Sequence, residues 1–340
     1  MQRFVVQPDL HQALLGLGDV TPALQHPYLP PWYRLVRAPG KIVLEHGQRI
    51  VCLEGAAADR LLPAMLPLLD GTRTVDEIVR MLGEPARPAV ENVIVELDGR
   101  GVLIDGPPIE ADEPRPVAET AQFLAALRPG GPSLAGTVAA LRGCSVGIAG
   151  DGASGAEAAR TLRSAGVDVR RIEGPAVGVD LTICAPSPVE LPGLRPWNDQ
   201  ALAAAATWLQ LLPFDGLYAA IGPLYLPGDT CCYECFRLRR AANIDAVEEL
   251  PLLEATPARY PSSPSVDTIA GAIAAQLAMG WLVHGDHYAP AAFYALQLMP
   301  TVSLTLHHVH RVPRCHACSG LADVSPPLGW YKEAALAPGV

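Results

Sequence analysis

The sequence has no excess of positive charge. It carries 35 acidic residues against 25 lysines and arginines, which gives a formal charge of −10 over 340 residues. Proteins that bind phosphate backbones or anionic lipid surfaces present basic patches, because much of their affinity comes from neutralising phosphates. The composition therefore argues against nucleic acid and against an acidic membrane surface as partners.

Signals for export and for membrane insertion are also lacking. Residues 1–12 contain no basic segment followed by an apolar run and a small-residue cleavage site, as a secretory signal requires. The longest apolar stretch, 268–283, is interrupted by Gln276 and is shorter than the roughly 20 residues that cross a bilayer. We therefore expect a soluble, cytoplasmic protein without membrane contact, in which residues 268–283 form a buried helix.

Length and hydrophobicity predict two domains. Half of the residues are hydrophobic and the mean hydropathy is +0.22, which is enough apolar material for two cores. Residues 106–120 are rich in proline and acid and have no apolar periodicity, which is typical of a linker. We expect an N-terminal domain over residues 1–106, a linker and a helix over 107–133, and a second domain over 134–340.

The first half of the N-terminal domain consists of predicted strands and one helix. Residues 32–54 contain three β-rich runs separated by turn residues. Residues 57–69 form a helical segment that Pro63 and Pro67 should bend or shorten.

Two further helices are predicted in this domain. Thr74 and Glu77 have the spacing of a capping box ahead of a short helix that ends before Gly83. A third helix begins near Pro88, and four apolar residues recur in it at helical spacing. These residues are Val90, Val93, Ile94 and Leu97. With a closing strand at 102–104, the order of elements predicts a winged-helix-like domain.

Winged-helix domains often bind DNA, but the third helix of this one is acidic. It carries Glu91, Glu96 and Asp98, and no cation before Arg100. Phosphates lining the major groove would repel such a helix. We therefore expect this domain to bind something other than DNA.

A strand, a glycine-rich turn and a helix open the second domain. The strand-like run 144–149 leads directly into Gly150-x-Gly152-x-x-Gly155, and a second strand ends at Glu173. Such glycines allow close approach to a nucleotide pyrophosphate, and an acid about 20 residues later would bind ribose. They also allow a helix to pack tightly on a sheet, so the motif predicts a Rossmann-like fold rather than a function. Because the chain reaches its next strand soon after Glu173, we interpret these four residues as a vestigial cofactor-binding set.

Two CxxC pairs predict a metal site. Cys232 with Cys235, and Cys315 with Cys318, can place four thiolates around one zinc ion. Four protein ligands leave no open coordination position, so this zinc would be structural. Two separated pairs do not resemble a redox motif, which needs one CxxC at a helix start. Cys231 adjoins the first pair and could replace a ligand in a shifted register.

The other cysteines suggest no further site. Cys52, Cys144 and Cys184 lie in apolar, strand-like runs and are expected in the core. No Cys, Ser or Lys has a recognisable nucleophile setting, so we assign no catalytic residue.

Two parts of the sequence resemble proteins of ribosomal peptide biosynthesis. Residues 29–55 and the three helices after them resemble the PqqD-like leader-peptide recognition domain. Residues 220–240 and 310–320, which contain the CxxC pairs, resemble ThiF-type, ubiquitin-activating-like proteins that accompany YcaO cyclodehydratases in thiazole and oxazole peptide biosynthesis. Active members of the ThiF type place an Arg, a Lys and a magnesium-binding Asp beyond the second strand, a segment that this chain lacks.

The resemblance implies a leader-binding adaptor for a YcaO cyclodehydratase. It implies that the partner uses the ATP and forms the azoline, while this chain holds the precursor peptide. The leader would add as a strand beside Arg49, Ile50, Val51, Cys52 and Leu53. Its apolar side chains would contact Val90, Val93, Ile94 and Leu97, although this stripe can also face the domain's own core.

Several points stay open at this stage. An adenylating ThiF-type enzyme and a nucleotide-dependent oxidoreductase are the alternatives, but both leave the N-terminal domain unexplained. The peptide sequence, the heterocycle formed and the oligomeric state, a homodimer included, cannot be deduced from the sequence.

Overall fold

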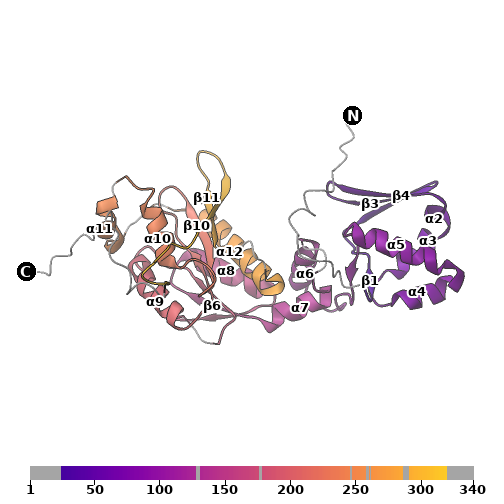
Figure 1. Ribbon diagram of the computed structural model, residues 1–340, viewed down its shortest axis with the longest axis horizontal. Helices are drawn as coiled ribbons and strands as arrows, with labels where there is room; N and C mark the ends of the chain where they lie inside the picture. The colour runs from indigo at the N-terminus through magenta and orange to yellow at the C-terminus, as the bar shows by residue number, and fades with distance from the viewer. Residues whose placement is uncertain are drawn as a thin grey trace, which may run out of the picture. The chain divides into compact units, whose positions relative to one another are not determined.

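The computed structural model describes residues 24–127, 131–175, 178–245, 247–257, 260, 262–285 and 291–319. They form two compact units (Figure 1). The first contains the described residues of 1–108 and 125–134, and the second contains those of 109–124 and 135–340.

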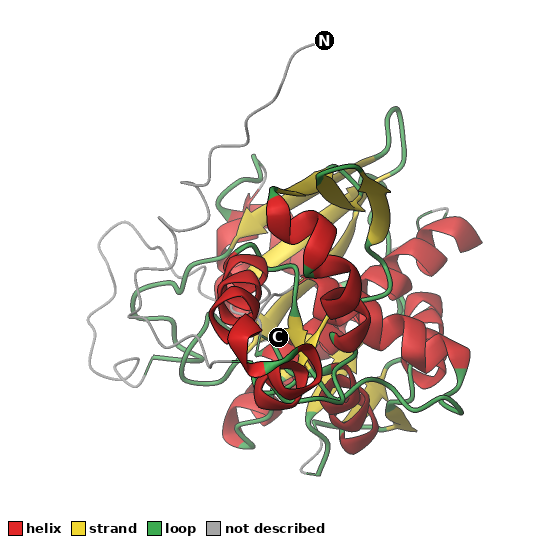
Figure 2. Ribbon diagram, turned by 90° about the vertical axis from the view of Figure 1, so that its right-hand side faces the viewer, coloured by secondary structure: helices red, strands yellow, loops and turns green. Residues whose placement is uncertain are grey.

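The first unit contains a three-stranded antiparallel sheet. Its strands, in spatial order, are β2 (Arg34–Ala38), β3 (Lys41–His46) and β4 (Arg49–Glu54). Ile42, Leu44 and Val51 are buried while their neighbours along each strand are more exposed, so the sheet buries one face. Figure 2 shows the helices of this unit packed to one side of these strands. The three predicted strands are confirmed.

The helices of this unit are short. They are α2 (Ala56–Arg60), α3 (Leu62–Met65), the 3-10 helices η1 (Leu66–Leu68) and η2 (Glu84–Ala86), α4 (Val75–Leu82) and α5 (Arg87–Gly99). The helix predicted over 57–69 is divided into α2, α3 and η1, since Pro63 and Pro67 each lie in the first turn of a new segment. The capping box is present: Glu77 donates its N–H to Thr74 Oγ1 at 3.3 Å, and Thr74 donates its N–H to Glu77 Oε2 at 2.9 Å.

The closing strand has a partner that the sequence did not reveal. β5 (Ile104–Asp105) pairs antiparallel with β1 (Pro27–Tyr28) and does not join the three-stranded sheet. Asp105 Oδ1 accepts the N–H groups of Gln25 and His26 at 3.0 and 2.8 Å. These contacts tie the start of the described chain to the segment after α5.

One helix occupies the region predicted as linker and helix, and another begins the segment predicted as the second domain. They are α6 (Arg115–Leu127) and α7 (Leu134–Gly143). Residues 115–120, predicted as linker, are helical because Pro116 is compatible with a first turn and Arg115 pairs with Glu119 one turn later at 2.7 Å.

A seven-stranded mixed sheet forms the centre of the second unit. The strands are β6 (Ser145–Ala149), β7 (Asp168–Arg171), β8 (Leu181–Cys184), β9 (Trp208–Leu211), β10 (Ala219–Tyr225), β11 (Ala292–Gln297) and β12 (Ser303–His308). Their order is β12-β11-β10-β9-β8-β6-β7, with parallel pairing from β7 to β9 and antiparallel pairing from β9 to β12. The α/β fold class predicted from the sequence is confirmed.

Helices cover both faces of this sheet. α8 (Ala153–Ser164) and α12 (Pro264–His284) share a core with one face, and α9 (Leu194–Ala203) and α10 (Tyr233–Ala241) share a core with the other. The remaining short helices are η3 (Leu191–Gly193), η4 (Val247–Glu249) and α11 (Leu250–Ala255). By length and composition alone, α12 is long and apolar enough to cross a membrane. Within its most apolar stretch of 18 residues, 39% is buried in the unit. The predicted helix therefore exists but is only partly buried.

Candidate functional site

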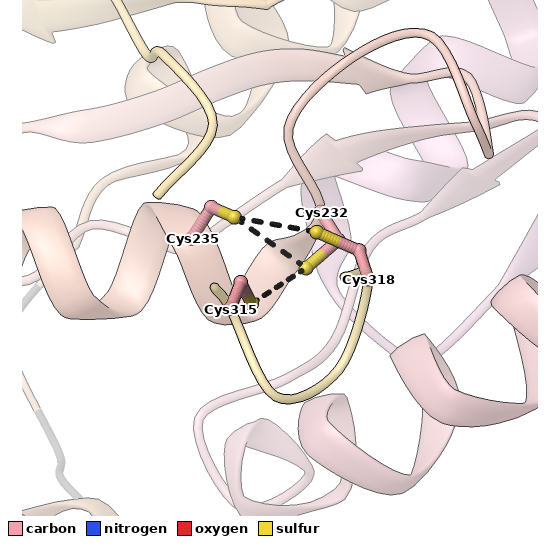
Figure 3. Close-up of side chains that lie close together, drawn as sticks. All are labelled: Cys232, Cys235, Cys315 and Cys318. Carbon is pink, nitrogen blue, oxygen red and sulfur yellow. Dashed lines mark hydrogen bonds between the residues drawn. The ribbon is translucent and has the colours of Figure 1, made fainter. Parts of the chain in front are cut away.

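The four cysteines of the CxxC pairs lie together. Cys232 caps the N-terminus of α10 and Cys235 lies in its first turn, while Cys315 and Cys318 belong to the turn segment after β12 (Figure 3). The Sγ atom of Cys232 lies 3.8 Å from the Sγ atom of Cys235 and 3.8 Å from that of Cys315. The Sγ atoms of Cys235 and Cys318 are 3.6 Å apart. All four sulfur atoms lie within 4.8 Å of one another.

These distances fit a tetrahedral zinc site. With Zn–S bonds of about 2.3 Å, the edges of a regular tetrahedron of sulfur atoms measure about 3.8 Å. Cys232, Cys235 and Cys315 are buried and Cys318 is partly buried, so water is largely kept from the centre. Four such thiols would hold the metal, and all four coordination positions would then be filled by the protein.

The close sulfur atoms perturb one another's ionisation. The hydrogen bond with Cys235 raises the pKa of Cys232, and the same bond lowers the pKa of Cys235. Val312 also donates its backbone N–H to Cys235 Sγ at 3.3 Å. The centre is therefore already arranged to favour at least one thiolate, which is the form that binds metal.

Two arginines that the sequence analysis did not identify hold the CxxC pairs in place. Arg311 donates to the carbonyl oxygens of Gly228 and Cys318 at 2.8 and 2.9 Å. Arg239, on α10, donates to the carbonyl oxygen of His310 at 2.7 Å. In the sequence, these two arginines were marked only by their closeness to the CxxC pairs. The spacing of the cysteines gave no reason to assign them a role.

The glycine-rich loop lies between β6 and α8, as predicted, and it packs tightly on the end of β8. Gly150 has φ +88°, and a Cβ there would lie 2.4 Å from the carbonyl oxygen of Ala185. A Cβ at Gly155 would lie 2.7 Å from the Cβ of Ala185. The glycines are thus needed for contact between the loop and the sheet, whether or not a nucleotide binds.

A carboxylate accepts one hydrogen bond from this loop and two from the segment after β8. Glu190 Oε2 accepts the N–H of Asp151 at 2.9 Å and the N–H and Oγ–H of Ser187 at 2.7 and 2.8 Å. Partial burial alone would raise the pKa of Glu190, but the bonds from Asp151 and Ser187 lower it below its ordinary value. The group is therefore charged at neutral pH, beside the place where a pyrophosphate would lie. Glu173 follows β7 and is exposed.

β4 forms an open edge of the first sheet. Among the described strands it pairs only with β3. The N–H of Gly55 donates to the carbonyl oxygen of Gly40 at 3.2 Å, so these two residues form a hydrogen-bonded pair. In an antiparallel ladder, every second residue of β4 then bonds to β3. It follows that Arg49, Val51 and Leu53 bond to β3, whereas the N–H and C=O groups of Ile50 and Cys52 point outward.

The side chains of β4 are less buried than the sequence suggested. Ile50 is 63% exposed, and Cys52 is also exposed, so the expectation that Cys52 lies in the core was wrong. Both alternate with Val51, which is buried. An edge strand with one covered face naturally exposes every second residue. Cys184 is buried, as expected, and Cys144 is partly buried.

Most of the apolar stripe of α5 faces the core of its own unit. Val90, Ile94 and Leu97 are buried, in one hydrophobic cluster with Leu44 and Val51. Val93 is only partly buried at the rim of that cluster. Of the four residues predicted to contact a peptide, Val93 keeps accessible surface, whereas the other three are occupied by core packing.

Comparisons with known proteins give a fold but no family. No family model matches the sequence, and no curated protein matches it. The structure is similar to that of a heterocyclase in complex with substrate and cofactor, with a TM-score of 0.67 and 23% identity over 86% of this chain and 39% of that one. It is also similar to the heterocyclase TruD, with a TM-score of 0.66 and 22% identity over 86% of this chain and 43% of TruD.

A second group of similar structures consists of MccB from E. coli. The complex of MccB with ATP matches with a TM-score of 0.61 and 14% identity over 86% of this chain and 99% of MccB. This chain thus spans about two fifths of the heterocyclases and nearly all of MccB. At these identities the likeness is one of fold.

Proposed function

We propose that this chain is a non-catalytic, cytoplasmic adaptor. It binds the leader of a ribosomally made precursor peptide and delivers that peptide to a separate YcaO cyclodehydratase, which forms thiazolines or oxazolines. The observation that carries the proposal is the open edge of β4 in a small unit that precedes a ThiF-type fold.

The edge supports the proposal through its backbone. The outward N–H and C=O groups of Ile50 and Cys52 can form a ladder with an extended peptide, as in β-strand addition. Leu53 and Val93 both lie at the partly buried rim of the core, where they offer apolar surface for peptide side chains. Affinity would come from the backbone bonds, and sequence preference from that rim.

The glycine loop supports the non-catalytic part of the proposal. A nucleotide would have to displace the Glu190 carboxylate from the N–H of Asp151 and place phosphates beside its charge. The structural zinc has no free position for a reacting group. Chemistry is therefore assigned to the partner, which binds the ATP.

A matched pair of variants at one residue tests leader binding. Cys52→Pro removes an outward N–H from β4 without breaking a bond to β3, whereas Cys52→Ala keeps the backbone donor. We expect Cys52→Pro to weaken binding between about five- and thirtyfold, which is the loss of 1–2 kcal/mol, and Cys52→Ala to bind like wild type. The measurement is fluorescence anisotropy with labelled leader peptides of candidate ribosomal precursors. Equal affinity of both variants would refute the binding mode.

The alternative function, peptide adenylation, deserves a direct test because MccB has this fold in complex with ATP. ATP–pyrophosphate exchange by this chain alone, with the precursor peptide present, would establish it. Our proposal expects no exchange above the level of a protein-free control.

A further inference from the structure

A buried carboxylate lies inside the first CxxC pair. Glu234 is in the first turn of α10, between Cys232 and Cys235, and its side chain is only 3% exposed. A buried charge is costly unless it is paired and hydrogen-bonded. Arg237, one turn along α10, is its partner: Nη2 donates to Glu234 Oε1 at 2.7 Å, and Nε donates to Glu234 Oε2 at 3.0 Å. The orientation of Arg237 is therefore set by a residue of the first CxxC pair.

Glu234 also contacts the second CxxC pair and α9. His316, inside the second pair, has its Nε2 atom 3.7 Å from Glu234 Oε1. Arg195 of α9 has its Nε atom 3.4 Å from Glu234 Oε2. With both pairs bound to one zinc ion, the turn that contains His316 is held against the start of α10. Glu234 thus links the two pairs through a contact that is separate from the sulfur atoms.

The other branch of the Arg237 guanidinium group binds α11, which lies beside α10 in the second unit (Figure 1). Its Nη1 atom donates to Glu254 Oε2 at 3.0 Å, and the side chains of Arg237 and Glu254 are only 15% and 30% exposed. Hydrogen bonds between charged groups are stronger than neutral ones, and partial burial reduces their screening. A chain of three side chains therefore connects the first CxxC pair to α11: Glu234, Arg237 and Glu254.

α11 depends on such contacts for its position. It has six residues, which is too short for a helix to be stable alone in water. The structure describes all six, and of these only Leu250 is buried, whereas Leu252 and Leu253 are 68% and 63% exposed. Burial of its own side chains therefore stabilises α11 little. The bond between Arg237 and Glu254 is directed and charge-assisted, so it fixes the helix where apolar packing is sparse.

We propose that zinc occupancy controls the position of α11, and that Glu234, Arg237 and Glu254 transmit this control. In the zinc-bound protein, Glu234 keeps its contacts with both CxxC pairs and orients Arg237 toward Glu254. Without zinc, the second pair can separate from α10, Glu234 gains access to water, and α11 is released by local opening. The proposal depends on the zinc assignment and is independent of leader binding.

The core on the opposite face of the sheet allows such a local opening. The helices α8 and α12 pack in a hydrophobic cluster that contains none of the four cysteines, whereas Cys232, Cys235 and Cys315 belong to the cluster on the other face. Release of α11 can therefore occur while α12 and the centre of the sheet stay folded.

Hydrogen exchange followed by mass spectrometry on the zinc-loaded chain tests the link to α11. Glu254→Ala removes the acceptor of Arg237 and changes no zinc ligand. Alanine favours helices at least as well as glutamate, so faster exchange would not reflect a loss of helix propensity. We expect exchange in residues 250–256 to become at least about fivefold faster, because the lost bond joins two charged groups. Exchange in residues 270–279 of α12 should stay unchanged, which shows that the unit is folded.

A second variant and a matched control test the route. Glu234→Gln, loaded with zinc, breaks the same chain at its other end and should also accelerate exchange in α11. Combining it with Glu254→Ala should add little, because the two residues act through one chain. The control is Asp215→Asn, since Asp215 also binds an arginine of α10, Arg240, at 3.0 Å. It should leave exchange in α11 unchanged.

Zinc affinity gives an independent measurement, because coupling between two equilibria is reciprocal. If zinc fixes α11, then releasing α11 must weaken zinc binding by the same factor. Competition with a chelator should therefore show zinc binding at least about fivefold weaker in Glu254→Ala than in wild type or Asp215→Asn.

Two results would overturn the coupling while leaving the zinc site intact. The first is unchanged exchange in residues 250–256 of zinc-loaded Glu254→Ala. The second is faster exchange there with unchanged zinc affinity, because α11 would then be held independently of the metal. Wild-type protein that binds no zinc would overturn the zinc assignment and this proposal together, so the two failures are distinguishable.

Discussion

Removing half of the metal shell should release the zinc and destabilise the second unit. Cys315→Ser combined with Cys318→Ser leaves two thiolates, Cys232 and Cys235, both at the start of α10. Structural zinc sites of this kind contribute about 10–16 kcal/mol of apparent binding free energy at neutral pH. That is as large as the total stability of a typical domain, about 5–15 kcal/mol. The double variant should therefore lose the packing around the centre as well as the metal.

The assay combines metal analysis with thermal unfolding. We expect one zinc per wild-type chain, almost none in the double variant, and a lower unfolding temperature by circular dichroism. The matched control is Cys231→Ser, because Cys231 is buried beside the centre but does not belong to the cluster of four sulfur atoms. It should keep its zinc. Wild-type protein purified without zinc, or a double variant that retains it fully, would refute the assignment.

Two further predictions concern α5 and the glycine loop. Val93→Asp should weaken leader binding and leave the circular dichroism spectrum native. Val90→Asp should instead unfold the first unit, since a buried unpaired carboxylate costs several kcal/mol. Equal unfolding by both variants would show that Val93 also belongs to the core. Because folding lowers the pKa of Glu190, its contribution to stability is present above the unfolded pKa and is lost as the pH falls through the folded value. Glu190→Gln should therefore lower the unfolding temperature at pH 7 more than at pH 3, and a pH-independent change would contradict this.

Local signals in the sequence predicted much of the fold. The strands β2 to β4, the capping box at Thr74 and the strand–glycine loop–helix order at Gly150 all depend on neighbouring residues, and all are present. The prediction was poorer where distant segments meet. β1 is two residues long and is stabilised by its pairing with β5, which no local pattern reveals.

The candidate site shows the same division. The CxxC spacing was enough to predict that four cysteines would meet, because metal ligation imposes that spacing. The role of Glu190 could not be predicted, since it lies 39 residues from Asp151 and belongs to no motif. The exposure of Cys52 depends on which face of β4 the helices cover, and the local sequence alone does not say which face that is.

The separation of the two CxxC pairs along the chain has a consequence for biosynthesis. Cys232 and Cys315 are 83 residues apart. At 5–20 residues per second, about 4 to 17 s pass between the synthesis of the first ligand and that of the third. During that interval the first pair can hold a metal ion only with two thiolates, so the full shell forms late, after β10, β11 and β12 have been synthesised. Zinc supply should therefore affect the final step of maturation of the second unit and leave the earlier folding of the first unit unchanged.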